Sequence, residues 1–402
     1  MPHFQLALLL GMTVALGPLA LDAYLPAFPA IAADLGVKSA DVGLTLSAYV
    51  VALGLAQLVG GPLSDRYGRQ RILLGGMGLF AVAAFMVSQA SSLQEMLLWR
   101  MTQGVGGAFC AVSVPAIVRD TVSGNEAARL FSLIGLIMFI APAAAPGLGT
   151  LLMAVSGWPA IFVVLSLYAL LLGLVLHLLL FRRLPERKSR EHTPMLTMVT
   201  NYWQVLSHPV AMRLVLLQSL AFSVMLVFIT HASFIYQEWF GLTSTRFSLL
   251  FAANIAVMAV INLINRRLLL SRSSIGLLRV ASFIKGAALL GVVFLAWSGA
   301  SYWTVAVCIM VAVGCMGAIV PNNMANALEF FPHIGGTASA LLGATQFTLA
   351  GSISALSAAM APQTLLPVTL TMALCAMGSV LLAAGAPAAV RAWAPQPGSA
   401  MR

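Results

Sequence analysis

Twelve stretches of about twenty mostly apolar residues follow one another along this 402-residue chain. A helix needs about 20 such residues to cross the hydrocarbon core of a bilayer. The stretches show no strand-like alternation, so they predict membrane-spanning helices rather than a barrel. They cover approximately residues 4–27, 41–62, 72–90, 95–116, 128–153, 158–181, 212–235, 246–268, 276–298, 302–325, 337–359 and 364–389.

Composition supports the membrane interpretation. Asp, Glu, Lys and Arg make up only 8% of the chain, and apolar residues make up 60%. Soluble domains carry about 25% charged residues, and disordered chains carry few apolar ones. Both of those classes are therefore excluded.

The first stretch could be a cleaved signal peptide or a retained helix. It lacks the basic residues that precede the apolar part of a signal peptide, and it contains Asp22, Pro18 and Pro26. We expect a retained helix.

The chain divides into two blocks of six stretches. The longest polar segment, 182–211, predicts a cytoplasmic linker between an N-terminal six-helix bundle (1–181) and a C-terminal six-helix bundle with a short tail (212–402). Val114-Pro115 and Val320-Pro321 each precede a polar loop and suggest an internal repeat. Such a repeat is typical of transporters, although any two apolar blocks resemble each other to some degree. We predict an all-α membrane protein with two pseudo-symmetric bundles.

Basic residues predict the orientation. With both termini cytoplasmic, seventeen of the 21 Lys and Arg residues lie inside and two, Lys38 and Arg246, lie outside; Arg100 and Lys285 fall within spans. This asymmetry follows the positive-inside rule. The net charge of +10 is therefore explained by basic residues that orient the chain and contact anionic lipid. No nucleic-acid partner is expected.

The sequence contains no recognisable motif for binding a metal or a nucleotide. All four cysteines lie within predicted spans without metal-ligand spacing, which favours a packing role. Neither a Walker loop nor a nucleophile elbow is present. We expect no cofactor and no enzymatic activity.

The loop after the second stretch carries the first resemblance to a known family. Residues 61–71, GPLSDRYGRQR, resemble the signature loop of the major facilitator superfamily, G-x-L-a-D-r-x-G-r-R/K, with Gln70 at a commonly basic position. The resemblance implies twelve helices and a cytoplasmic latch between the halves, with 335–337 as partner. The implied latch residues are Gly61, Asp65, Arg66, Gly68, Arg69 and Arg71. The arginines could instead serve only as orientation signals.

Two charged residues inside the spans lie in strings that carry a second resemblance. The strings are LDAYLPAFP at 21–29 and RMTQG at 100–104. The first resembles the first helix of Bcr/CflA-type drug:proton antiporters, and the second is similar to the R-x-x-q-G motif of the family. An Asp at the bilayer centre costs about 2.5–3.5 kcal/mol, which usually implies a function. The resemblance implies that Asp22 and Arg100 couple protons to transport. Alternatively, Asp22 lies at the outer interface, and Arg100 extends outward and is neutralised by Glu95.

The fifth stretch resembles the antiporter motif of drug exporters, G-x-x-x-G-P-x-x-G-G, with Ala141 in place of a Gly. This resemblance favours export over import. The residues that carry it are Gly135, Pro142, Pro146 and Gly147.

Polar and aromatic residues within the spans are candidates for a substrate cavity, although most such residues join helices or pack. Lys285 has no visible acidic partner, so its role and that of His231 stay open. The candidate cavity residues are Tyr24, Tyr49, Gln103, Phe139, His231 and Asn254.

These resemblances imply proton-coupled efflux of amphipathic drugs across the bacterial inner membrane by alternating access. The expected partners are small molecules, protons and membrane lipid, and the expected state is a monomer powered by the proton gradient. An alternative is a facilitator-fold carrier for a natural metabolite such as an amino acid or sugar, which would need several polar residues in its cavity. A membrane enzyme or receptor would need a further domain or a catalytic cluster, for which the loops are short.

Overall fold

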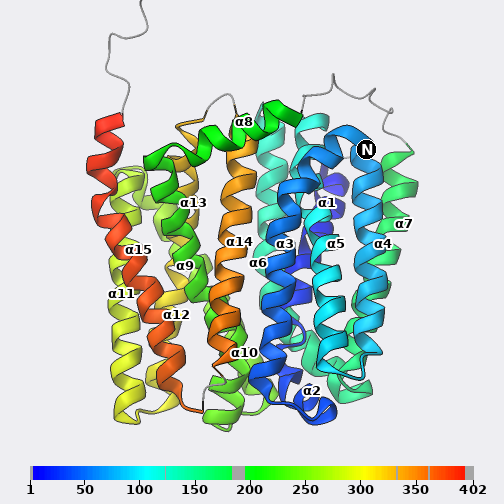
Figure 1. Cartoon of the computed structure of the whole chain (residues 1–402), viewed down its shortest axis with the longest axis vertical. Coiled ribbons are helices and arrows are strands. Elements are labelled where there is room, and N and C mark those ends of the chain that lie inside the picture. The colour runs from blue at the N-terminus through cyan, green and yellow to red at the C-terminus, as the bar shows by residue number, and fades with distance from the viewer. Residues whose placement is uncertain (1–2, 123, 183–194, 332–333, 361–362, 394–402) are drawn as a thin grey trace, which may run out of the picture.

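The computed structural model describes residues 3–122, 124–182, 195–331, 334–360 and 363–393, and all regular structure in these segments is helical. Figure 1 shows the helices arranged side by side along one long axis. The elements are α1 (His3–Asp22), η1 (Leu25–Ala27), α2 (Phe28–Leu35), α3 (Ser39–Tyr67), α4 (Arg69–Ser88), α5 (Leu93–Thr121), α6 (Gly124–Ser156), α7 (Pro159–Val175), η2 (Leu176–Phe181), α8 (Met195–Leu206), α9 (Pro209–Ser233), η3 (Phe234–Trp239), α10 (Ser244–Leu268), α11 (Ser274–Ser298), α12 (Tyr302–Gly314), α13 (Met316–Leu328), α14 (Gly335–Ala359) and α15 (Leu365–Trp393).

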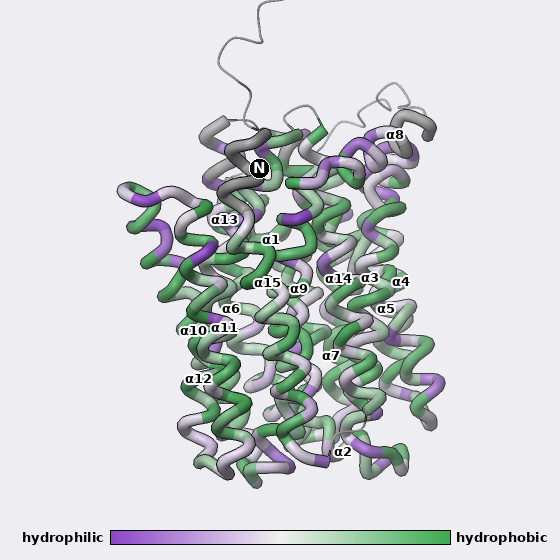
Figure 2. Tube along the Cα trace, turned by 60° about the vertical axis from the view of Figure 1, so that its left-hand side comes forward, coloured by the Kyte–Doolittle hydropathy of each residue, from purple (hydrophilic) through white to green (hydrophobic). Residues whose placement is uncertain are grey.

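Within the described segments, twelve helical spans are long and apolar enough to cross a membrane, which confirms the predicted all-α fold. Hydrophobic residues occupy most of their length (Figure 2). The first span is longer than predicted, Phe4–Leu35, because a short 3-10 turn, η1, joins α1 to α2. The tenth span is made of α12 and α13, which meet at Cys315.

The two ends of the molecule carry different elements (Figure 1). The N-terminus, α8 and the end of α15 lie at one end, which we name the terminal face; α2 lies at the other, the distal face. Helix α8 occupies part of the predicted linker, and the Tyr202 hydroxyl donates to the carbonyl of Leu58 in α3 at 3.3 Å. The charged linker segment 183–194 and the tail 394–402 lie outside the described residues.

The first and last six spans meet along α3 with α14 and α6 with α10. On the distal half of α3, Ser47 Oγ donates to Ser354 Oγ of α14 at 3.1 Å, and Ser354 Oγ lies 2.6 Å from Thr230 Oγ1 of α9. Between α6 and α10, Thr150 Oγ1 lies 3.0 Å from Ser248 Oγ. Hydroxyl groups thus join the two halves near the distal face, where small side chains allow close contact.

Candidate functional site

Asp22 is the last residue of α1, directly before the break that leads to η1. Its side chain is only 5% exposed, so it does not lie at a solvated outer interface, which was the alternative placement. Its Oδ1 atom has no hydrogen-bond partner among the residues that the structure describes. Burial of an unpaired polar group costs free energy, so a carboxyl in this position points to a function.

Arg100 of α5 is fully buried. Its Nη1 donates to Gln103 Oε1 at 2.6 Å, while its Nε and Nη2 have no hydrogen-bond partner within the described segments. Glu95 does not neutralise it, because the Glu95 carboxylate accepts hydrogen bonds from the backbone and hydroxyl of Ser91. The alternative in which Arg100 extends outward to the membrane surface is therefore wrong.

Three aromatic rings surround the Arg100 guanidinium. Its carbon lies 4.5 Å from the ring centre of Tyr24, 4.6 Å from that of Tyr49 and 5.8 Å from that of Phe162. Tyr24 lies between α1 and η1, Tyr49 in α3 and Phe162 in α7. The electron-rich faces of aromatic rings attract a cation, most strongly when water is excluded. We name Arg100, Gln103, Tyr24, Tyr49 and Phe162 the arginine cage.

Asp22 and Arg100 are not joined by a salt bridge among the described residues. The structure connects them through Tyr24, which follows Asp22 by two positions and stacks on Arg100. Tyr24 is itself held by Thr45, whose Oγ1 lies 3.1 Å from the Tyr24 hydroxyl. The functional coupling of Asp22 and Arg100 stays a prediction.

Glycines of α5 make room for the cage. A Cβ atom at Gly104 would collide with the carbonyl oxygen of Tyr49, and one at Gly107 would lie 2.7 Å from the Tyr49 hydroxyl. The lack of side chains at these positions explains how α3 approaches α5 closely enough for Tyr49 to cover Arg100.

The motif of the fifth span lies in α6, which continues through both buried prolines, Pro142 and Pro146. Gly135 and Gly147 have no neighbour within 4 Å of a Cβ atom placed on them. The close approach occurs instead at Gly149, where such an atom would overlap the carbonyl oxygen of Ala23, next to Asp22. Gly149 was not among the predicted site residues, although it ends the same Pro-Gly-x-Gly string.

Replacement of Gly149 by Ala is expected to separate α6 from the first span. The added methyl group meets backbone, which cannot rotate away, so we expect a loss of about 1–3 kcal/mol of stability and reduced transport. Thermal unfolding in detergent measures the change. Gly147→Ala, two residues earlier with open space, is the matched control and should be neutral or stabilising by up to about 1 kcal/mol. Equal unfolding temperatures for the two variants would contradict the close approach.

The signature loop joins α3 to α4 through Gly68, whose φ of 94° suits glycine. Arg69 pairs with Asp65 at 2.5 Å and with Asp120 of α5 at 3.2 Å. Arg66 stacks on the ring of Tyr67 at 5.4 Å. Arg71 is exposed, and Gly61 has open space around it. Both ion pairs lie within the first six spans, so the latch to residues 335–337 stays a prediction.

Arg69→Gln is expected to loosen the connection between the α3–α4 loop and α5. Both ion pairs are partly exposed, so each contributes at most about 1 kcal/mol. We expect slower transport with little change in unfolding temperature, measured by initial efflux rates. Arg272→Gln removes the same charge from an exposed position between α10 and α11, outside the signature loop, and should transport normally. Equal losses in the two variants would indicate an effect of the charge alone.

The candidate cavity residues have different environments. Tyr24, Tyr49 and Gln103 belong to the arginine cage, and His231 and Asn254 are buried between helices. His231 Nε2 lies 3.0 Å from Ser357 Oγ, and Asn254 donates to the carbonyl of Leu250 at 2.8 Å. Phe139 is the member of the set that lines a described cavity, an apolar groove between α6 and α10 of about 420 Å³.

Polar side chains in the second half connect helices, as expected. Gln218 of α9 donates to Gln346 of α14 at 2.5 Å and accepts from Asn323 of α13 at 2.9 Å. Lys285 of α11 is fully buried, and its Nζ donates to the carbonyl of Ala221 and to the sulfur of Met316. Lys285 therefore does not extend to the membrane surface.

Known proteins with similar sequence or structure agree on one family. The family model of the Major Facilitator Superfamily matches residues 10–355. The chain is 30% identical over 381 residues to a bicyclomycin resistance protein homolog of Haemophilus influenzae, covering 94% of this chain and 95% of that protein. It is 31% identical to a chloramphenicol resistance protein of Pseudomonas aeruginosa, covering 89% and 84%. The fold matches the inward-open xylose transporter XylE of E. coli with a TM-score of 0.75 and 13% identity, over 96% and 95% of the two chains. Its relatives include drug-resistance proteins of the Bcr type. With its twelve apolar spans, this chain is a multi-pass membrane transporter that belongs to the major facilitator superfamily.

Proposed function

We propose that this protein exports amphipathic drugs in exchange for protons by alternating access, as a monomer whose terminal face is cytoplasmic. The observation that carries the proposal is Asp22, a buried carboxyl that has no salt-bridge partner in the described part of the chain and lies next to the arginine cage. The drug-resistance names of its relatives favour drugs as substrates. The distribution of Lys and Arg supports the orientation.

Asp22 is the proposed proton carrier. It lies at the break of the first span, directly before the turn η1, which contacts α9 and α10 of the second half, so its surroundings change when the two halves move. Arg100 cannot release its own proton in practice. Its role is to supply a fixed positive charge, which compensates the Asp22 carboxylate once the proton has left. Tyr24 lies between Asp22 and Arg100, so a movement of one of these residues is passed to the other.

The groove between α6 and α10 is the proposed contact for the apolar part of the substrate. It draws residues from both halves, so alternating access would change its shape. All its lining residues are apolar: Phe139, Ile140, Ala143, Ala144, Ala252, Ile255, Ala256 and Ala259. A sugar or amino acid would need polar partners there, so this lining favours an amphipathic drug over a natural metabolite.

Drug susceptibility in a pump-deficient bacterial strain tests the proposal. Expression should raise resistance to drugs such as chloramphenicol and lower intracellular drug, and an uncoupler that removes the proton gradient should abolish both effects. Resistance that persists with the uncoupler would argue against proton coupling. A lack of resistance, together with gradient-dependent uptake of a sugar or an amino acid, would favour the metabolite carrier.

A further inference from the structure

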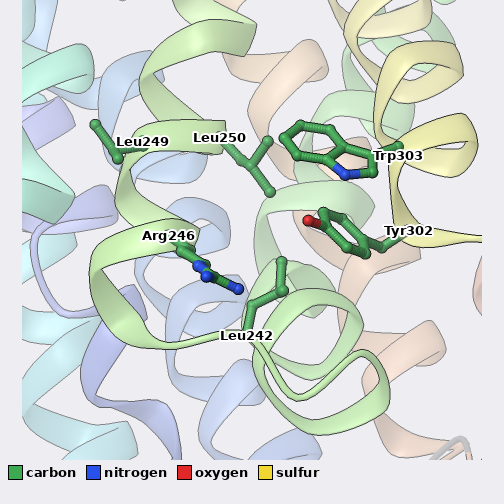
Figure 3. Close-up of a pocket in the computed structure, with 6 residues that line it drawn as sticks. All are labelled: Leu242, Arg246, Leu249, Leu250, Tyr302 and Trp303. Atoms are coloured by element: carbon green, nitrogen blue, oxygen red, sulfur yellow. The ribbon is translucent and has the colours of Figure 1, made fainter.

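A second cavity lies at the distal face of the second half and shares no lining residue with the Asp22 site (Figure 3). It lies between the first turn of α10 and the first turn of α12 and has a volume of about 300 Å³. Its lining residues are Leu242, Arg246, Leu249, Leu250, Tyr302 and Trp303.

The cavity faces the surrounding membrane. Leu249 is 67% exposed and Trp303 58% exposed, although both are apolar residues on transmembrane helices. Trp297, at the end of the neighbouring helix α11, is 77% exposed. Exposed tryptophans near helix ends mark the level at which lipid headgroups meet the hydrocarbon core. The cavity therefore opens at headgroup level, with leucines extending toward the acyl chains.

Arg246 gives this cavity a positive charge. Its side chain is exposed, and it forms no ion pair among the described residues. The N-terminus of α10 adds to the positive potential, since its first-turn amides point the same way. In Figure 3 the Arg246 guanidinium and the Tyr302 hydroxyl both point into the cavity, from opposite sides. None of the lining residues is acidic.

We propose that this cavity binds an acidic phospholipid from the leaflet at the distal face. Its phosphate accepts hydrogen bonds from Arg246, whose planar guanidinium matches phosphate geometry, and from the Tyr302 hydroxyl. One acyl chain lies against Leu249, Leu250 and Trp303. A zwitterionic lipid is disfavoured because its ammonium group would meet the cavity without a carboxylate to pair with. The site does not depend on drug export or proton coupling.

Native mass spectrometry of the purified full chain tests this site. The protein is titrated with phosphatidylglycerol and, separately, with phosphatidylcholine of the same acyl chains. The unmodified chain should bind phosphatidylglycerol more tightly. Arg246→Gln should weaken that binding roughly tenfold, equivalent to about 1.4 kcal/mol. Lys38→Gln, which removes the other exposed basic residue of the distal face, is the matched control and should bind normally.

Leu249→Trp provides a second variant in case Arg246→Gln is poorly folded. It fills the cavity from an exposed position and keeps the charge, so it should also weaken phosphatidylglycerol binding. Equal binding of the two lipids by the unmodified chain would overturn the proposal, as would a preference that survives in both variants. The same spectra report oligomeric state: a dimer that both variants disrupt would assign the cavity to a second copy of the chain and overturn the lipid site. None of these outcomes bears on drug efflux, which is measured separately.

Discussion

Asp22→Asn is expected to abolish proton-driven drug accumulation and to leave drug binding largely intact. Asn has nearly the shape of a carboxyl group but cannot carry the transported proton. One proton that moves through 100 mV and one pH unit supplies roughly 3.7 kcal/mol. That energy sustains a roughly 500-fold gradient of a neutral drug. In proteoliposomes with an imposed pH gradient, the variant should therefore show no uphill accumulation.

Asp34→Asn is the matched control for this experiment. Asp34 belongs to the same span, in α2, and its carboxylate accepts a hydrogen bond from the Trp158 indole at 3.0 Å. It is exposed, so its replacement should leave gradient-driven transport unchanged. Full gradient-driven exchange by Asp22→Asn would overturn the assignment of Asp22 as proton carrier. Equal loss in both variants would indicate a structural role for the first span instead.

Arg100→Gln is expected to abolish coupled transport without unfolding the protein. Two of the three guanidinium nitrogens of Arg100 have no hydrogen-bond partner among the described residues. Removal of the charge therefore relieves a desolvation cost that offsets the lost contacts with the aromatic rings. The new amide can still donate to Gln103. Thermal unfolding should therefore stay close to that of the unmodified chain, while efflux falls to background.

Arg100→Lys separates the charge from the shape of the guanidinium. Lysine keeps the positive charge but cannot stack a planar group on Tyr24 and Tyr49, so partial transport is expected. Proton release on drug binding, followed with a pH indicator, distinguishes a coupling role from a purely structural one. Normal proton release and efflux by Arg100→Gln would show that Arg100 is a packing residue.

The membrane spans could be predicted from the sequence because each spanning helix forms its backbone hydrogen bonds within itself. In a bilayer core a helix must form its hydrogen bonds internally, so twenty apolar residues are enough to specify it. The first span shows where this reasoning stops. Its apolar stretch was expected to end near residue 27, but η1 lets the chain bend and continue as α2 to Leu35.

The arginine cage could not be predicted in the same way. Asp22 and Arg100 were identified as charges in apolar surroundings and as parts of family motifs, and both are buried. Their partners come from other helices, and the sequence distance between Arg100 and Phe162 gives no indication that they meet. Gly149 likewise acquires its importance only where α6 crosses the first span.

The sequence by itself therefore determined the number of spans, the family and the two unusual charges, because insertion into a membrane and motif spacing depend on local residues. Only the tertiary structure decided which groups surround those charges. Contacts with aromatic rings and the hydrogen bond to Gln103, rather than pairing with Asp22, hold Arg100 in this conformation. The physical reason is that contacts between spans depend on how the helices rotate and cross one another. Small residues such as Gly104 and Gly149 permit a close crossing, but the apolar sequence of a single span does not specify which helix it will contact.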